Sequence, residues 1–515
     1  MNRSIIRSLI IMSVIGVAAL AGALLCERVS DARLAKPTLG YTDEEILALP
    51  YFDLLASAAE NRGLPADVES YSIGDGYIHL LLPESVDERA VTVYIRDMEG
   101  ELLARKVYDF TGKVMIGDWE VVTDRHVLPT LYFESTDPAV YEAMVSSETK
   151  DIICEGNVHV CAEGKEINPA LSFTSEASLQ GRGASSWEVC KSKKSYSLRF
   201  KKSRNLLGLG SNKNWNLIGN AFDVSLIRNT VFNTVCKNMG ISYQPGMQSV
   251  NLYVDGKYEG VYTLTNKIAV DKDQAPLGQG DYFYRKQPDD PVIPIPYRSK
   301  TWFNEGTDKP VAELIFPEEA TSEDTVAARE AFQRFIDAVE DPGSDLESVC
   351  DLSNLARYYW IQEASMNIDA WERGVYMYYK GAEGKMYLGP VWDMDLTLGC
   401  PTPKLGVEFD TPYGWKIREG GWYKPLFENE EFARAVIREY HEGGVREALF
   451  EGIEEFSRQR RALGADAYLN YLLYGHANEW VTVLERGDSY DEYCDNMIGF
   501  YKDRVEWIDE QMSME

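Results

Sequence analysis

Three aspartates in the second half of the chain have the residue type and spacing needed to bind a hard cation and to accept a proton. Asp393 and Asp395 lie two positions apart on a segment expected to be extended, so both carboxylates point the same way and can bind Mg²⁺ through oxygen. Asp369, at the end of a predicted helix, could accept a hydroxyl proton. Such carboxylates serve phosphoryl transfer, although an isolated D-x-D also caps turns or pairs with arginines.

A basic, glycine-containing segment is the second group that could do chemistry. The sequence GRGASSW at 181–187 precedes several lysines and a strand-like alternation of apolar and polar residues. A glycine-containing turn lets the backbone approach an anion, and lysines neutralise phosphate charge. We expect an anion site that includes Arg182, Ser185, Lys193 and Lys194. The alternative is a solvated edge strand whose lysines block aggregation.

The elements that must position these groups change in type along the chain. Residues 1–26 form a signal peptide or membrane anchor, and 27–69 a linker with a short helix over 44–61. Residues 70–125 are predicted to form a small β-sandwich-like domain, with strands at 77–82 and 90–95. A second domain follows over 126–515, β-rich to about 270 and mainly helical afterwards. Its predicted helices cover 323–339, 352–367 and much of 429–512. The fold class is therefore α+β.

These segments together resemble the spore coat protein H (CotH) family of atypical kinases. Six blocks carry the resemblance in the family's order: GRGASSW at 181–187, NLLG at 205–208, WNLIGNAFD at 215–223, SLIRN at 225–229, LYVDGKYEGVY at 252–262 and GPVWDMD at 389–395. The resemblance implies a bilobal kinase-like domain that binds ATP and Mg²⁺ and transfers the γ-phosphoryl group to protein hydroxyls.

Matching positions imply a role for individual residues. Lys193 or Lys194 looks like the phosphate-holding lysine, and Asp369 like the catalytic aspartate. Asp393 looks like the principal metal ligand, with Asp395 as a second one.

Three departures from the family's pattern bear on activity. Ala184 stands where the family usually has Asn, and Asn266 where it often has Glu. Gly374 occupies the position of a metal-binding Asn in the kinase pattern D-x-x-x-x-N. These departures keep a second hypothesis open, that of a weak or inactive CotH-like scaffold that acts as a surface or spore-coat binding protein.

Composition and the N-terminus indicate where such a protein works. The formal net charge of −30 argues against nucleic acid as a partner, which leaves a protein substrate or a surface protein. Arg3 and Arg7 precede an apolar run over 9–26, the pattern of an export signal. Cleavage, retention as an anchor by residues 5–26, and lipidation at Cys26 all stay possible; any membrane contact is expected through this segment alone.

Cysteine usage suggests one candidate disulfide. Cys154 and Cys161 flank a segment that could form a hairpin, and an exported protein could join them. The alternative is that the two cysteines are neighbours in sequence only. No pattern of cysteines or histidines suggests zinc.

Overall fold

The structure, a computed structural model, divides the chain into two compact units, Met1–His126 and Val127–Glu515. In the first unit it describes seven strands. In the second it describes residues 127–514 apart from short gaps at 163–170, 184–186, 188–192, 271–274, 287–290, 302–309, 400–407 and 475–489.

The strands of the first unit form two sheets. One has the order β1-β4-β5 and the other β2-β3-β7-β6. The predicted strands at 77–82 and 90–95 are confirmed as β3 and β4, while β1 occupies a segment for which the sequence predicted helix. The packing of the sheets as a sandwich stays a prediction. The bounds are β1 Asp53–Ala58, β2 Ser70–Gly74, β3 Tyr77–Leu81, β4 Ala90–Arg96, β5 Leu102–Asp109, β6 Val114–Ile116 and β7 Trp119–Asp124.

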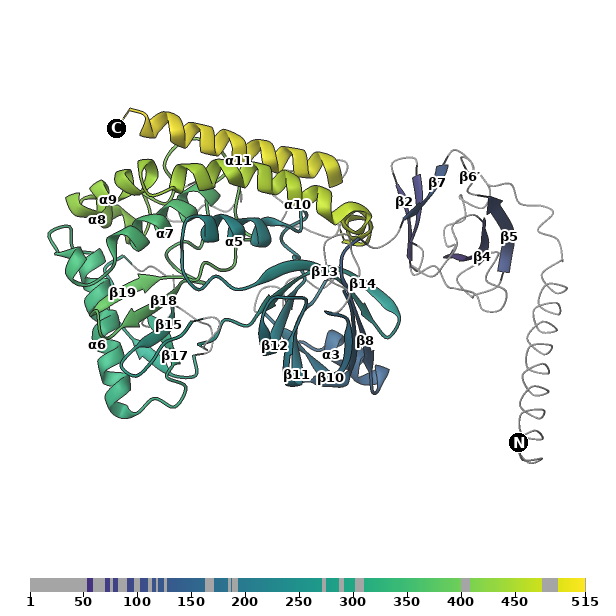
Figure 1. The fold of residues 1–515 in the computed structure, drawn as a ribbon, viewed down its shortest axis with the longest axis horizontal. Helices are drawn as coiled ribbons and strands as arrows, with labels where there is room; N and C mark the ends of the chain where they lie inside the picture. Colours follow the sequence, from purple (N-terminus) through teal and green to yellow (C-terminus); the bar gives the residue numbers. More distant parts are fainter. Residues whose placement is uncertain are drawn as a thin grey trace, which may run out of the picture. The chain divides into compact units, whose positions relative to one another are not determined.

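The second unit begins with a closed seven-stranded barrel in the order β10-β11-β12-β14-β13-β8-β9 (Figure 1). Neighbours in this order pair antiparallel, except that β8 pairs parallel with β13 through Thr130–Phe133 and Asn251–Val254. The strands and the helix α3 that follows β8 have these bounds: β8 Thr130–Ser135, α3 Pro138–Ser146, β9 Ile153–Cys161, β10 Phe173–Arg182, β11 Ser195–Asn205, β12 Ser211–Ile218, β13 Met247–Val254 and β14 Lys257–Asn266.

Alternating residues fill the barrel. On β11, Tyr196, Leu198 and Phe200 are buried while Arg199 between them is exposed, because successive side chains of a strand point to opposite faces. The alternation that the sequence shows here is thus confirmed, and it leaves polar side chains on the outer face.

The predicted hairpin between Cys154 and Cys161 is wrong. Both residues belong to the continuous strand β9, one near each end, and they are not joined to each other. A strand rises about 3.3 Å per residue, so their Cα atoms are much farther apart than the roughly 7 Å limit for a disulfide.

A second sheet and a set of helices complete the unit. The sheet has the order β16-β17-β15-β18-β19. Two predicted helices are confirmed as α6 and α7, and each begins at a side-chain cap, Thr321 and Asp351 respectively. The bounds are β15 Tyr282–Lys286, β16 Pro294–Pro296, β17 Val311–Phe316, α6 Ser322–Val339, α7 Leu352–Ser365, β18 Tyr376–Lys380 and β19 Lys385–Leu388.

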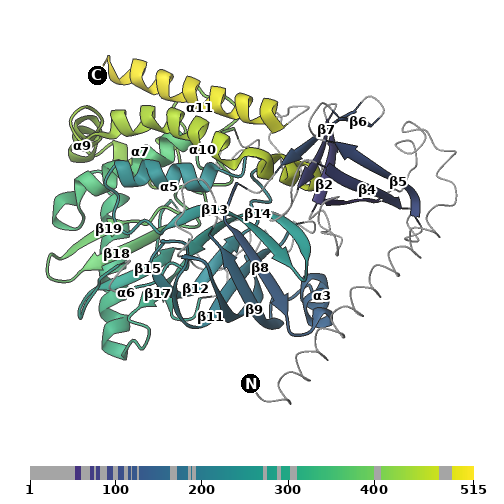
Figure 2. The same cartoon turned by 45° about the vertical axis from the view of Figure 1, so that its right-hand side comes forward.

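Long helices cover one side of the unit. Figures 1 and 2 show α10 and α11 side by side, with α5 and α7 between them and the sheets. The helical prediction for 429–512 is confirmed by α9, α10 and α11. The bounds are α5 Arg228–Asn238, α8 Tyr423–Phe427, α9 Glu430–His441, α10 Val445–Tyr474 and α11 Tyr490–Met512. The structure is therefore mixed α+β.

The apolar run at 9–26 lies outside the described residues. Among the helices that are described, none combines the length and the apolarity that a membrane crossing requires.

Candidate functional site

The three candidate carboxylates come together from two different parts of the chain. Asp369 follows α7, and Asp393 and Asp395 follow β19. A hydrogen bond from Leu398 N to Ser365 O, 2.9 Å, joins the end of α7 to the segment after the aspartates. Asp369 lies near enough for its negative charge to raise the pKa of Asp393. Asp369 and Asp393 are therefore close in space, which their spacing in the sequence could not show.

Asp393 and Asp395 form an interacting carboxyl pair. Asp393 is accessible to solvent, yet so much protein surrounds it that desolvation is the largest cause of its raised pKa, followed by the charge of Asp369. The pKa of Asp395 is raised well above its ordinary value by desolvation and then by the charges of Asp393 and Asp223. Two adjacent acids that resist ionisation favour a proton or a cation between them.

Arg182, at the end of β10, belongs to the predicted anion site and lies beside these carboxylates. Burial lowers the pKa of its guanidinium, while the charges of Asp393 and Asp395 act in the opposite direction. Its guanidinium carbon lies 6.0 Å from the centre of the Trp392 ring. Arg182 therefore stays close to the aspartates and remains available to an anion there.

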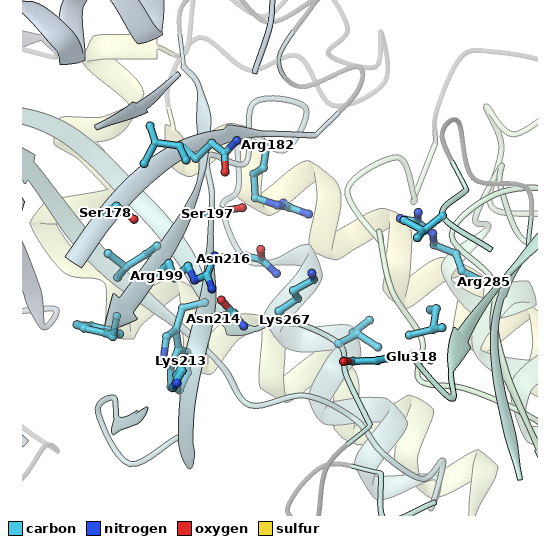
Figure 3. A pocket seen from close by; sticks show the side chains of 18 of the residues that line it. Ser178, Arg182, Ser197, Arg199, Lys213, Asn214, Asn216, Lys267, Arg285 and Glu318 are labelled. Carbon is cyan, nitrogen blue, oxygen red and sulfur yellow. The ribbon is translucent and has the colours of Figure 1, made fainter. Parts of the chain in front are cut away.

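A cavity of about 890 Å³ opens beside Arg182, between the outer face of the barrel and the second sheet (Figure 3). In a chain of net charge −30 its lining carries six basic residues and three acidic ones. The basic residues are Arg182, Arg199, Lys201, Lys213, Lys267 and Arg285. Figure 3 shows Arg199, Lys213 and Lys267 grouped on the barrel side, with Arg285 on the other side of the view and Glu318 between Lys267 and Arg285. The cavity is suited to a polyanion.

The register of the barrel strands produces this basic wall. Arg199 on β11 pairs with Ser178 on β10 and with Asn214 on β12, so their side chains form a polar row across the outer face. Ser197 and Asn216 form the next row, which lies nearer to Arg182. Apolar groups complete the cavity lining elsewhere, namely Ile268, Ile293, Ile315, Tyr376 and Trp392.

Lys193 does not line this cavity. Its ammonium group is buried and donates to Val261 O and to Asn470 Oδ1, both at 2.5 Å. It also lies within 5.2 Å of the centres of the Tyr262 and Tyr474 rings. Desolvation lowers the pKa of Lys193 well below its ordinary value. In the structure the residue thus connects β14 to α10.

Lys194 and Ser185 complete the predicted anion site. Lys194 Nζ donates to Trp187 O at 2.5 Å and lies 4.7 Å from the centre of the Trp187 ring. Ser185, together with Ala184, lies outside the described residues. The predicted phosphate contacts of Lys193, Lys194 and Ser185 therefore stay predictions.

The two remaining departures from the family pattern have different surroundings. Asn266 is buried, accepts from Gly246 N at 3.1 Å and donates to Leu209 O at 3.4 Å, so it fixes two loops. Gly374 lies beside the aspartates. A Cβ atom on Gly374 would be 3.5 Å from Asp393 Cβ and 4.0 Å from Asp393 Oδ2. The position predicted for a missing metal ligand is therefore adjacent to Asp393.

The carboxylates of Asp393 and Asp395 are the type of ligand that Mg²⁺ binds. The ion prefers oxygen ligands and usually takes one or two carboxylates from the protein, leaving further positions to water and phosphate oxygens. Asp393 and Asp395 supply that pair. Within the part of the chain that the structure describes, no cluster of three or more acidic, histidine or cysteine side chains could hold a metal. Asp369 therefore does not join Asp393 and Asp395 in such a cluster, and the pair alone fits an ion that takes its other ligands from water and phosphate.

Sequence reasoning did not identify the buried polar residues that hold the site. Lys286 on β15 donates to Trp371 O at 2.5 Å and to Glu372 O at 3.4 Å, in the turn that follows Asp369. Asn229 on α5 accepts from Met394 N at 2.9 Å, between the two metal-candidate aspartates. For Asn229, the resemblance of the block SLIRN to the family gave a signal without a role; for Lys286 the sequence gave no signal.

Comparison with known proteins places the chain in a family. None of the curated proteins matches it. A family model described as CotH kinase protein matches residues 179–508, well over half of the chain, from the middle of β10 to the last turns of α11. The matched region includes Arg182, most of the barrel residues that line the cavity and all three aspartates, and the chain therefore belongs to the CotH family.

Proposed function

We propose that this protein is an exported CotH-like protein kinase, which transfers the γ-phosphoryl group of ATP to a hydroxyl of a protein substrate with Mg²⁺. One observation carries the proposal: Arg182, which lines a large basic cavity in a strongly acidic protein, lies near Asp393 and Asp395, and Asp369 lies near Asp393. Carboxylates for a cation and a proton, next to cations for phosphates, are the groups that phosphoryl transfer needs.

The cavity is the proposed nucleotide site. Its volume of about 890 Å³ lies within the range of small-molecule sites, roughly 300–1,000 Å³. Its basic wall suits the triphosphate, and the apolar side chains Ile268 and Ile315 suit a base. In this arrangement the barrel and the helical part act as the two lobes of a kinase-like domain.

Each candidate residue then has a role. Asp369 accepts the proton of the acceptor hydroxyl as its oxygen forms a bond to the γ-phosphorus and the bond to the ADP oxygen breaks. Asp393 and Asp395 would hold Mg²⁺, which would neutralise phosphate charge when bound. Arg182 would neutralise phosphate oxygens beside the two aspartates. A phosphate role for Lys193 or Lys194 stays a prediction.

The location and partner belong to the same proposal. The N-terminal run at 9–26 would direct export or anchor the protein at the membrane, and the family resemblance suggests the cell surface or the spore coat. The acceptor is then a surface or spore-coat protein.

A second candidate function is a nucleotide-binding scaffold without efficient transfer. The observation that favours it is Gly374, which lies beside Asp393 and has no side chain to bind a cation. Such a protein would bind ATP with low metal affinity and turn it over slowly or not at all.

Two measurements on the purified full chain test the proposal. With γ-labelled ATP and Mg²⁺ we expect phosphate incorporation into the protein or an added substrate, and its loss in Asp393→Ala and Asp369→Asn. The matched control is Asp503→Asn, an exposed aspartate of α11. A rise in melting temperature with ATP and Mg²⁺, without incorporation, would favour the scaffold. Neither a rise nor incorporation with any divalent metal would contradict both functions.

A further inference from the structure

Two buried asparagines hold the segment that carries the metal-candidate aspartates. Asn229, in the first turn of α5, accepts a hydrogen bond from Met394 N at 2.9 Å. Asn367, just after α7, donates to Met394 Sδ at 3.7 Å. Both asparagines are at most 4% exposed. Two helices that are distant in sequence therefore hold the same residue, the one between Asp393 and Asp395.

Asn367 also holds the proposed proton acceptor. Its Oδ1 accepts from Asp369 N at 3.0 Å, and its Nδ2 donates to Gln362 Oε1 at 2.9 Å. A single amide side chain therefore contacts the backbone of the Asp369 segment and the side chain of Met394. The separation between Asp369 and the Asp393–Asp395 pair depends on this bridge.

The backbone at Asp393 explains why outside support is needed. Its φ is +65°, a left-handed conformation that costs a non-glycine residue about 1–2 kcal/mol and persists only when neighbouring contacts hold it. That conformation directs the next N–H, that of Met394, to Asn229. The extended backbone predicted for this segment is therefore wrong at Asp393. Without the acceptor, the N–H would be buried and unsatisfied, and a change in the turn's conformation would change the relative orientation of the two carboxylates.

We propose that Asn229 and Asn367 are positioning residues for the kinase site: they set the orientation of Asp393 and Asp395 toward a shared cation and their distance from Asp369. This inference rests on the proposed function. It predicts that deleting the Asn229 acceptor weakens cation binding even when the protein stays folded.

Direct Mn²⁺ binding to the full chain is the test, measured by the loss of the free-ion signal in electron paramagnetic resonance. Asn229→Leu keeps the approximate size and removes the acceptor. We expect roughly 10–100-fold weaker Mn²⁺ binding, the effect of removing a partner that orients a metal ligand. Asn229→Asp keeps an acceptor oxygen, and the positive end of α5 tolerates its charge, so it should bind Mn²⁺ nearly as the wild type does.

A matched control comes from the same helix. Asn238, in the last turn of α5, donates to Glu451 Oε2 at 3.0 Å on the surface, away from the aspartates. Asn238→Leu should leave Mn²⁺ affinity unchanged. A general loosening of α5 would lower affinity in both Leu variants and would overturn the inference. If Asn229→Leu does not fold, Asn229→Ala and Asn367→Leu test the same loss with a different change in packing.

A double variant tests whether the two asparagines act through the same residue. Because both hold Met394, the combined loss in Asn229→Leu/Asn367→Leu should be smaller than the product of the single losses. A full product would contradict a shared support.

The possible outcomes separate the two proposals. Wild-type affinity in Asn229→Leu, in a sample that is folded by circular dichroism, overturns the inference and leaves the proposed function standing. Absence of Mn²⁺ binding in the wild type, with or without ATP, overturns the proposed function and with it the positioning roles.

Discussion

At the scale of single residues, the Asp393–Asp395 pair determines how the site responds to pH. Desolvation raises the pKa of both carboxyls above their value in the unfolded chain, which is about 3.9; the charge of Asp369 adds to the rise at Asp393, and the charges of Asp393 and Asp223 add to the rise at Asp395. At a pH between the pKa of these carboxyls in the unfolded chain and their higher pKa in the folded protein, the folded protein binds more protons than the unfolded one. The pair therefore contributes most to stability at low pH, and this contribution is lost as pH rises through the folded-state pKa.

The first prediction follows for Asp395→Asn without metal. At about pH 7.5 the variant should melt about 2–4 °C above the wild type, equivalent to about 1 kcal/mol, because a repulsive charge is gone. The difference should shrink as the pH falls and the wild-type pair takes up protons. Differential scanning calorimetry in metal-free buffers measures it. A difference that is constant across this range would contradict the raised pKa values.

The second residue-scale prediction concerns Gly374. Its φ of +67° suits Asn better than other side chains, and its Cβ position is at ordinary contact distance from Asp393. Gly374→Asn should therefore add an oxygen ligand and tighten Mg²⁺ binding about tenfold, worth about 1.4 kcal/mol. Isothermal titration calorimetry with Mg²⁺ measures it. Gly374→Ala is the control, since it adds a Cβ atom and no ligand; equal effects of both variants would contradict the assignment.

The sequence singled out three of its 82 acidic residues, Asp369, Asp393 and Asp395, by their spacing and by the resemblance of the surrounding segments to the family. Their roles stay predictions. The surroundings of Lys193 could not be predicted from the sequence. A lysine that precedes a strand can point into a cleft or into the protein interior, and here its direction is set by acceptors that are distant in sequence, Val261 and Asn470.

At the scale of elements, one buried ion pair links α7 to α11. Arg504 and Glu363 are fully buried and paired, and Glu363 also accepts from Lys416 N and Arg418 N. Arg504 Nη1 donates to Pro412 O and Gly414 O at 2.9 and 2.7 Å. The pair therefore fixes the segment 412–418 against the helix that leads to Asp369.

The third prediction is that Arg504→Met lowers the free energy of unfolding by about 3–5 kcal/mol, because it leaves the Glu363 carboxylate buried without its counter-charge. Urea denaturation at neutral pH measures the loss. Arg446→Met is the matched control: Arg446 joins α10 to α11 through Asp509 at the surface, and its loss should cost at most about 1 kcal/mol. Equal losses in the two variants would show that burial is not the cause.

Elements with strong local patterns were predicted well. The helices over 323–339 and 352–367 were placed within two residues of α6 and α7, because caps and apolar spacing are local signals. Barrel closure was not predicted, because it depends on β8 pairing with β13, which lies far along the chain. The strand at Asp53–Ala58 was predicted as helix because isolated short segments carry weak propensities.

At the scale of the whole molecule, the division at residue 127 predicts where the second unit can be separated. Val127 N and Leu128 N both donate to Asp466 Oδ2 at 3.0 Å, and Asp466 is fully buried on α10. A truncated chain over 125–515 should fold and keep the melting temperature of the second unit.

The fourth prediction compares this chain with one that begins at residue 130. Removing both donors to a buried carboxylate should cost about 2–4 kcal/mol. Urea denaturation of the two truncated chains measures the difference. Equal stability would contradict the contribution of the Asp466 contact, and failure of both to fold would contradict an independent second unit.

The parallel contact between β8 and β13 also affects the order of events when the protein is made. The first strand of the barrel emerges long before its partner over 247–254, so the cylinder cannot close until both are present. Until then β8 and β13 each expose an unpaired edge to other chains. If the polypeptide is exported with its N-terminus first, β8 reaches the far side of the membrane before β13 does. Folding there would be slow because it waits for a long-range strand pairing, and until that pairing forms, self-association would compete with folding.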